Sequence, residues 1–333
     1  MRYIRFLLAA SALREVKGFS VTEVRNAISE YSFRSLNTLR PALPLEEKKD
    51  ALCPAVWTTI VSELTALFID KSVSPSQCNG NARAAIREAF HDCGTWDRSQ
   101  GSTGGCDGSV ILAREAYTRP INNGLQDISD KLLALQKRYP SVSVADIIQV
   151  ASSVAVVTCP GGPRVTTYVG RKDSNVPNPD GLLPDVHASG ASLFALFQDK
   201  GFDARDLAAL LGAHSTSKSV SLAPEIPVGG QQDSTPGIWD VKYYSETLKP
   251  QAGVFPFQSD VNLAKHPEVG KEFSGFVNNQ GKWTGKFADA MFRMSLLGVP
   301  GGTSNLIDCT NVIPKGTSSK RDIKAAPIND RAR

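Results

Sequence analysis

The sequence predicts a mostly α-helical protein, and three observations support this fold class. Apolar residues recur every three or four positions in most segments, first at Val56, Ile60, Leu64 and Leu67, which is the spacing of one helix face. The alternation of β-branched side chains that is typical of a strand is seen in a single stretch, residues 165–171. A chain of 333 residues is also long enough to bury a large core in about two domains.

Turn and capping signals divide the chain into helices and loops. Asp203 and Asp206 are spaced like a capping box, so a helix is expected to begin there. Polar segments rich in Gly, Ser, Pro or Asn, at residues 92–109 and 175–184, are expected to form loops. Helical spacing predicts helices over residues 53–70, 81–91, 125–139, 144–157, 189–197, 203–214, 273–278 and 287–296.

The net charge of +4 is concentrated at the two ends of the chain. Residues 1–44 hold seven Lys or Arg and three Asp or Glu, and residues 310–333 hold six and two. The segment between them, residues 45–309, therefore carries a charge of −4. This mildly acidic body argues against nucleic acid as a partner. No stretch is long and apolar enough to span a bilayer, so a membrane partner is not expected either.

The cysteines predict disulfides and therefore an oxidising compartment. Six of them, an even number, are spread along the chain without a Cys-x-x-Cys pair, which argues against a zinc site. Arg2 and Arg5 flank the start of an apolar run, and small residues follow it, as in a signal peptide. We therefore expect a secreted, extracellular protein with a signal peptide and a propeptide or disordered lead over residues 1–44, and a disordered tail over residues 310–333.

Two segments present histidines in settings that suit a bound cofactor. Arg87 and His91 are four residues apart, so in a helix they lie one above the other on the same face. His214 comes at the end of the apolar run LAALLGAHS. A lone histidine on an apolar face is usually a satisfied core residue, but the chain has only four histidines. Together the two segments suggest a cofactor held between two helices, with one histidine on each side.

The loop at residues 92–109 has the composition of a calcium-binding loop. Carboxylates, hydroxyls and backbone carbonyls at alternating positions are the ligands that a hard cation needs. Asp92, Asp107 and Ser109 would supply side-chain oxygens, and Gly105 a carbonyl. From composition alone, a plain solvated turn is the alternative.

Four motifs of this chain resemble the secreted fungal class (class II) of plant-type haem peroxidases. They are RxxFHD at Arg87–Asp92, GCDGS at Gly105–Ser109, LGAHS at Leu211–Ser215 and DSTPGIWD at Asp233–Asp240. The resemblance runs in consistent order from about Cys53 to Cys309. It implies a mostly α-helical plant-type peroxidase fold, in which a distal domain over residues 45–188 and a proximal domain over residues 189–309 sandwich one haem b.

The resemblance also assigns roles around the haem. His214 would bind the iron, and a carboxylate at Asp260 would hydrogen-bond the far ring nitrogen and make the ligand more basic. On the open face His91 would act as the general base and Arg87 would stabilise the leaving oxygen of peroxide.

Two further residues would support the distal face. Asn122 matches the slot of an asparagine that accepts a hydrogen bond from the distal histidine, although the neighbouring Asn123 is an alternative in sequence. Phe90 would pack near the haem and exclude water. A third histidine, His187, is interpreted as a rim residue rather than a ligand.

Two calcium ions are implied, each beside one haem histidine. The first site would use Asp92, Gly105, Asp107 and Ser109, and the second Ser215, Asp233, Thr235, Ile238 and Asp240. The resemblance pairs Cys53 with Cys309 and Cys78 with Cys159. On proximity alone we expect Cys93 to pair with Cys106, which departs from the common fungal pattern.

The positions that select the electron donor in relatives are unusual here. Some relatives bind Mn²⁺ with three acidic residues, and those slots fall at Gly80, Ala84 and Val220, none of which can ligate manganese. Others use a surface tryptophan five residues before the proximal histidine, and that position is Ala209. We therefore expect a generic ligninase-like enzyme for phenols and small aromatic donors, and direct attack on bulky lignin is less expected.

The sequence therefore predicts a monomeric peroxidase that reduces hydrogen peroxide and oxidises such donors in successive one-electron steps. Two alternatives stay open. One is an intracellular enzyme of the cytochrome c peroxidase type, which would have six free thiols. The other is a secreted calcium-binding scaffold that has lost haem.

Overall fold

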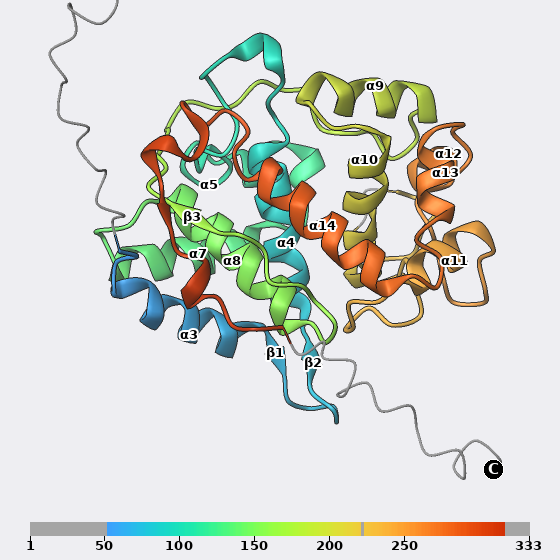
Figure 1. Ribbon diagram of the computed structural model, residues 1–333, viewed down its shortest axis with the longest axis horizontal. Coiled ribbons are helices and arrows are strands. Elements are labelled where there is room, and N and C mark those ends of the chain that lie inside the picture. Colours follow the sequence, from blue (N-terminus) through green and yellow to red (C-terminus); the bar gives the residue numbers. More distant parts are fainter. Residues whose placement is uncertain (1–51, 221–222, 317–333) are drawn as a thin grey trace, which may run out of the picture. The chain divides into compact units, whose positions relative to one another are not determined.

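The computed structural model describes residues 52–220 and 223–316, and most of this range is helical (Figure 1). The α-helices are α3 (Val56–Phe68), α4 (Gly80–Cys93), α5 (Ser109–Leu112), α6 (Glu115–Thr118), α7 (Gln126–Arg138), α8 (Val144–Thr158), α9 (Gly190–Lys200), α10 (Ala204–Leu211), α11 (Lys242–Leu248), α12 (Gln258–Ala264), α13 (Val269–Ser274) and α14 (Gln280–Met294). Short 3-10 helices include η3 (Pro120–Asn122) and η4 (Gly212–Thr216).

Helix α8 is the centre of the first half of the described chain. Its residues are buried from Val144 to Val157, as expected for a helix that is apolar all round. Helices α3, α4 and α7 pack around it. The face of α4 against the core consists mainly of small side chains, which let two helices approach closely: Ala82, Ala85, Ile86 and Ala89.

In the second half, α10 packs against α13 and α14, and α9 packs against α12. The indole of Trp283 on α14 fixes the end of α10, because its Nε1 donates to the carbonyl of Ala209 at 3.0 Å. A Cβ at Gly212 would lie 2.3 Å from the same nitrogen, so the close approach requires glycine. In Figure 1, α14 lies between α4 and α10.

The predicted helices over residues 53–70, 81–91, 125–139, 144–157 and 189–197 are present with shifted ends. The capping box of Asp203 and Asp206 is also present. The helix predicted through His214 is shorter, because α10 ends at Leu211 and His214 lies on η4. The change of helix geometry comes at Gly212, where Trp283 packs closely against the backbone.

Other boundaries were wrong. Of the strand predicted over 165–171, only Tyr168–Val169 forms a strand, β3, which pairs antiparallel with β4 (Ile307–Asp308). A second two-stranded pair joins β1 (Ile69–Asp70) to β2 (Gln77–Cys78). The helix predicted over 273–278 ends at Ser274, and α14 begins before 287. Helices α11 and α12 were not predicted, since seven residues give too short a pattern for a period to be recognised.

Three disulfides join the same pairs that the sequence suggested: Cys53–Cys309, Cys78–Cys159 and Cys93–Cys106. The first closes a loop with a sequence separation of 256, between the start of α3 and the residue after β4. Bridges that close long loops restrict the unfolded chain most in the chain-entropy model. No cysteine is free within the described part of the chain, which contains all six.

The lead predicted over residues 1–44 lies outside the described residues, as does the tail from residue 317. The domain boundary predicted at residues 188–189 stays a prediction. Among the described helices, none combines the length and the apolarity that a membrane crossing would require.

Candidate active site

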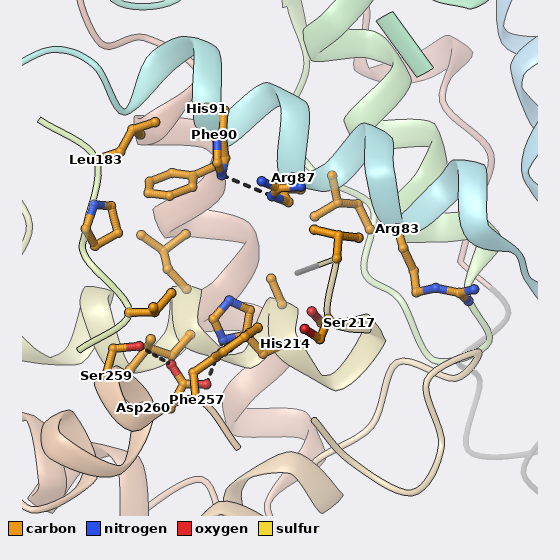
Figure 2. A pocket seen from close by; sticks show the side chains of 18 of the residues that line it. Arg83, Arg87, Phe90, His91, Leu183, His214, Ser217, Phe257, Ser259 and Asp260 are labelled. Carbon is orange, nitrogen blue, oxygen red and sulfur yellow. Dashed lines mark hydrogen bonds and ion pairs between the residues drawn. The ribbon is translucent and has the colours of Figure 1, made fainter. Parts of the chain in front are cut away.

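A cavity of about 780 Å³ separates α4 from α10 and η4 (Figure 2). Its walls are mostly apolar, with side chains such as Phe90, Phe197 and Phe257. Arg87 and His91 enter it from α4, and His214 enters it from η4 on the opposite side. The structure therefore brings the two predicted histidines to one cavity, facing each other across it.

His91 is held in one tautomer. Its Nδ1 lies 2.7 Å from Oδ1 of Asn122, and Nδ2 of Asn122 donates to the carbonyl of Glu115 at 3.0 Å. Since that amide oxygen can only accept, Nδ1 of His91 carries the proton and Nε2 is unprotonated. Asn122 rather than Asn123 is thus the partner of His91.

Arg87 is fixed by backbone carbonyls. Its guanidinium donates to the carbonyl of Asn123 at 2.8 Å and to that of Ile121 at 2.7 Å, and its Nε donates to Nε2 of His91 at 3.2 Å. Burial lowers the pKa of Arg87 to about 10, so it remains a cation at neutral pH. Helix α4 and the turn η3 therefore hold this positive charge beside the unprotonated nitrogen of the histidine.

The environment also keeps His91 uncharged. Burial lowers its pKa well below the ordinary value of 6.5, and the charge of Arg87 lowers it further, whereas the bond to Asn122 acts in the opposite direction. A neutral imidazole with an unprotonated Nε2 is a proton acceptor at neutral pH.

On the opposite side, Nδ1 of His214 lies 2.8 Å from Oδ2 of Asp260, and the Asp260 side chain is buried (Figure 2). Burial lowers the pKa of His214, but the charge and hydrogen bond of Asp260 together outweigh it, and the net pKa is raised. The ring packs edge-on against Phe257 and Tyr243. Its Nε2 has no hydrogen-bond partner within residues 52–220 and 223–316, so it is available to a group in the cavity.

The residues predicted for the first calcium site come together behind His91. Oδ2 of Asp92 accepts from the amide of Gly108 at 3.0 Å, and Oδ1 of Asp107 from that of Ser109 at 3.1 Å. The carbonyl of Gly105 accepts from Asn178 at 3.0 Å. Burial raises the pKa of Asp92, and the neighbouring Asp107 raises it further. The hydroxyl of Ser109 is buried and has no partner among the described residues.

The second predicted set is arranged similarly next to His214. The hydroxyl of Ser215 donates to the carbonyl of Ile238 at 3.2 Å, and that of Thr235 donates to Asp240 at 2.9 Å. Burial, opposed by the amide of Thr235 and reinforced by Asp240, raises the pKa of Asp233 to about 8. Oδ2 of Asp233 is buried and has no partner within the part of the chain that the structure describes.

Both sets pair two carboxylates with hydroxyl or carbonyl oxygens, and each leaves one buried oxygen unsatisfied. Buried like charges and unpartnered oxygens are the conditions that a bound cation relieves. No group of three or more His, Cys, Asp or Glu suited to a metal is found in the described ranges, so any cation here would depend on hydroxyl and carbonyl ligands as well.

Sequence reasoning missed two residues that support the site. Glu115 is buried and pairs with Arg119, and its backbone carbonyl orients Asn122. Asn178 donates to Thr95 at 2.8 Å and to Gly105 at 3.0 Å, and so ties the loop at 175–184 to the first acidic set. Neither residue carries a periodic or motif signal.

The rim and the donor positions also have defined places. His187 lines the mouth of the cavity, where it is partly exposed and its Nε2 lies 3.0 Å from Glu225. Gly80, Ala84 and Val220 line the same cavity without a side-chain ligand. Ala209 is fully buried.

Comparison with known proteins identifies the family. The peroxidase family model matches residues 63–279. The chain is 32% identical over 276 residues to the low-redox potential peroxidase of Taiwanofungus camphoratus. This aligned region covers 78% of the present chain and 77% of the relative. It is 32% identical to manganese peroxidase 3 of Phlebia radiata, and the aligned region covers 74% of each chain. It is 31% identical to versatile peroxidase VPS1 of Pleurotus eryngii, with 79% of this chain and 75% of the relative aligned. The chain therefore belongs to the plant-type peroxidase superfamily, among relatives of the fungal class II enzymes, and is an oxidoreductase that acts on hydrogen peroxide.

Proposed function

We propose that the chain is a haem peroxidase that reduces hydrogen peroxide and oxidises phenolic and small aromatic donors in successive one-electron steps. One observation carries the proposal. A single cavity has a carboxylate-bonded histidine, His214, on one side and a neutral histidine paired with an arginine, His91 and Arg87, on the other.

The cavity fits one haem b by its size, its apolar walls and its free imidazole nitrogen. His214 would hold the haem iron through Nε2, with Asp260 fixing the tautomer that leaves this nitrogen free. When bound, a histidine-ligated haem supplies the redox centre that accepts electrons from donors and passes them to peroxide.

The protein residues manage protons and charge. With haem bound to supply the electrons, Nε2 of His91 would take the proton from one oxygen of peroxide and return it to the other, which would leave as water. Arg87 stabilises the negative charge that develops on that leaving oxygen. Asn122 keeps the proton of His91 on Nδ1, so that Nε2 stays the acceptor. Phe90, which packs edge-on to His91, excludes water from the face where peroxide reacts.

Reconstitution with haem tests the ligand. Purified protein is expected to bind one haem per chain with the absorption spectrum of a histidine-ligated ferric haem, whereas His214→Ala loses that spectrum. His187→Ala, which removes the partly exposed rim histidine, is the matched control and should bind haem like the unmodified chain. An unchanged spectrum in His214→Ala would remove this residue as the ligand.

The acid limit of the reaction is a second test. Because the pKa of His91 lies well below 6.5, the neutral base persists as the pH falls and is lost only when the pH passes through that lowered value. The rate constant for the reaction with peroxide should therefore stay level from neutral pH to well below 6.5. Arg87→Gln removes the nearby cation, so its acid limb should move to higher pH in stopped-flow measurements.

We further propose two calcium ions, one in each acidic set. The first would bind Asp92, Asp107, Ser109 and the carbonyl of Gly105. The second would use the following residues of the later set: Ser215, Asp233, Thr235, Ile238 and Asp240. Each set is adjacent in sequence to one cavity histidine, since Asp92 follows His91 and Ser215 follows His214.

Removing calcium is expected to lower the free energy of unfolding by about 2–3 kcal/mol per site. This is the stabilisation that a ligand gives when its free concentration is ~100 times its dissociation constant. The haem spectrum should change at the same time, because each set abuts a cavity histidine. Urea unfolding and absorption spectra with and without a chelator measure both effects. Asp240→Asn should reproduce part of the loss in the free energy of unfolding. Asp289 is exposed and lies outside both sets, so Asp289→Asn should not reproduce it. A chelator that strips calcium and leaves the spectrum unchanged would contradict the coupling.

We propose an extracellular, monomeric enzyme with a distal domain over residues 45–188 and a proximal domain over residues 189–309. Three disulfides support an oxidising compartment. They disfavour the intracellular alternative, which requires free thiols. A scaffold without haem is disfavoured because hydrogen bonds hold Arg87, His91 and the Asp260–His214 pair around one cavity.

A further inference from the structure

We propose that Arg83, Lys218 and Ser219, here called the cationic rim, bind the carboxylate of phenolic donors at the mouth of the cavity. The enzyme accordingly prefers phenolic acids to neutral phenols of the same size. The inference rests on the proposed haem peroxidase function and names the donor class of that site. All three residues line the cavity. In Figure 2, Arg83 lies with Ser217 at the end of the cavity away from Leu183.

Arg83 is held in place through one nitrogen, and the rest of its fork is free. Its Nη1 donates to the carbonyls of Pro236, at 3.3 Å, and Cys78, at 3.4 Å. Its Nε and Nη2 donate to no group within residues 52–220 and 223–316. Nη2 lies 3.7 Å from the position that a Cβ on Gly80 would take, and Gly80 lines the cavity. The free edge of the guanidinium therefore borders the cavity, where its N–H groups can bind both oxygens of a carboxylate.

No carboxylate neutralises the two cations of the rim. Neither Arg83, which is half-buried, nor Lys218, which is exposed, forms an ion pair with another residue that the structure describes. Burial lowers the pKa of Arg83 from its ordinary value of 12.5, and the charge of Asp70 opposes this. Asp70 itself accepts from the amide of Ser72 at 2.9 Å. A half-buried cation that has lost water and gained no counter-charge favours an anionic ligand.

Ser219 gives an independent indication of a ligand. Its side chain is 2% exposed, and its hydroxyl, which has no partner among the described residues, belongs to the cavity lining. Backbone bonds fix its position, since its amide donates to the carbonyl of Gly230 at 2.7 Å and its carbonyl accepts from Gly229 at 2.9 Å. Lys218 forms an antiparallel bridge with Gln231 on the same segment. A buried hydroxyl on a fixed backbone is costly unless it is bonded, and a carboxylate oxygen would accept its proton.

Apolar side chains beside the rim suit the ring of such a donor. Val220 follows Ser219 and packs on Gly124, where an added Cβ would lie 2.9 Å from Cβ of the valine. Val228 precedes Gly229, lines the cavity and is 76% exposed. An aromatic ring laid on these valines would remove apolar surface from water. A phenolic acid can therefore place its ring on the valines and its carboxylate on the rim.

The exposed histidine at the mouth does not have this role. Nε2 of His187 lies 3.0 Å from Glu225, and its Nδ1 lies 3.6 Å from Asp185. Both ring nitrogens thus face carboxylates, and these two negative charges repel a third. The charge at the mouth therefore directs an anionic donor to the cationic rim and away from His187.

Calorimetry on the resting, haem-loaded enzyme tests the rim without catalysis, with benzoate as the probe and benzamide as its uncharged analogue. Benzoate should bind more tightly than benzamide to the unmodified enzyme. Its dissociation constant should rise at least ~10-fold in Arg83→Gln, the scale for loss of a hydrogen bond to a charged group. Lys218→Gln, at an exposed position, should weaken binding by a smaller factor. Arg205→Gln is the matched control, because Arg205 pairs with Glu272 and does not line the cavity.

Donor kinetics separate the rim from the chemistry of the reaction. In Arg83→Gln the KM for ferulate should rise at least ~10-fold while kcat is retained, because the lost contact holds the donor and not the reacting atoms. Methyl ferulate has the same ring without the charge, so its KM and kcat should be unchanged. Arg83→Lys keeps the charge and loses the fork, so it should recover part of the affinity for ferulate.

The other outcomes count against the proposal. Unchanged benzoate binding and ferulate KM in both Arg83→Gln and Lys218→Gln would overturn the rim and leave the peroxidase function intact. An equal loss with ferulate and methyl ferulate would show a structural role only. Loss of haem from Arg83→Gln, with benzoate binding unchanged, would mean that Arg83 holds a carboxylate of the haem instead of the donor. An enzyme that oxidises neither donor would overturn the proposed function, and benzoate binding would still decide on the carboxylate site.

Discussion

Replacing His91 with leucine is expected to slow the reaction with hydrogen peroxide by at least ~10²-fold, the scale for the loss of a positioned general base. Leucine fills a similar volume and leaves Asn122 and Arg87 in place, so the cavity should keep its shape. What disappears is the unprotonated Nε2, the proton acceptor that lies beside Arg87. The rate should therefore fall while haem binding is retained.

Stopped-flow measurement of the first oxidised form, at several peroxide concentrations, gives the second-order rate constant directly. His187→Leu removes a histidine from the rim of the same cavity and should react at the unmodified rate. An unchanged rate in His91→Leu would exclude this residue as the base. A spectrum altered before peroxide is added would instead show that the substitution disturbed haem binding.

The helix of Arg87 and His91 could be predicted because its information is local. A four-residue spacing places both side chains on one helix face, and the apolar positions between them define the buried face. The structure adds a bond of 3.2 Å between the two side chains, which follows from that spacing. The same local logic identified the capping box before α10.

The turn at His214 shows where local patterns fail. The apolar spacing continued through His214, so a helix was expected, but α10 stops at Leu211. At this point Trp283, which is far away in sequence, packs on Gly212, a contact that a local pattern does not contain. Residues that act through distant partners, such as Glu115 and Asn178, are equally invisible to a periodic pattern. The buried hydrogen bond to His91 shows that Asn122, and not Asn123, is the partner of this histidine. Sequence spacing alone could not make that choice.

Glu88 is a buried acid that neither the cavity nor the acidic sets use. It lies on α4 beside Arg87, its Oε1 accepts from the hydroxyl of Ser129 on α7, and its Oε2 has no partner among the described residues. Burial raises its pKa from 4.5 to about 8, although Ser129 and Arg87 act in the opposite direction. In the folded protein Glu88 is therefore a neutral acid at neutral pH, whereas in the unfolded chain it is ionised.

This difference makes stability depend on pH in a defined direction. Below the unfolded pKa of 4.5 both states hold the proton, and the pH has no effect through this group. Between 4.5 and about 8 only the folded state holds it, so the free energy of unfolding falls as the pH rises. Each pH unit in this window corresponds to about 1.4 kcal/mol. Above about 8 both states are ionised and the loss is complete.

Glu88→Gln keeps the shape and removes the titration. The free energy of unfolding of the variant minus that of the unmodified protein should therefore increase by about 4 kcal/mol from pH ~5 to pH ~8.5. Urea unfolding of both proteins at the two pH values, at a fixed calcium concentration, isolates the contribution of this one group. Glu268→Gln, at an exposed position, should show no such difference between the two pH values. If Glu88→Gln and the unmodified protein differ by the same free energy of unfolding at both pH values, Glu88 is ionised in the folded core, with Arg87 as its counter-charge. The description of α4 as carrying a neutral acid next to Arg87 would then have to be abandoned.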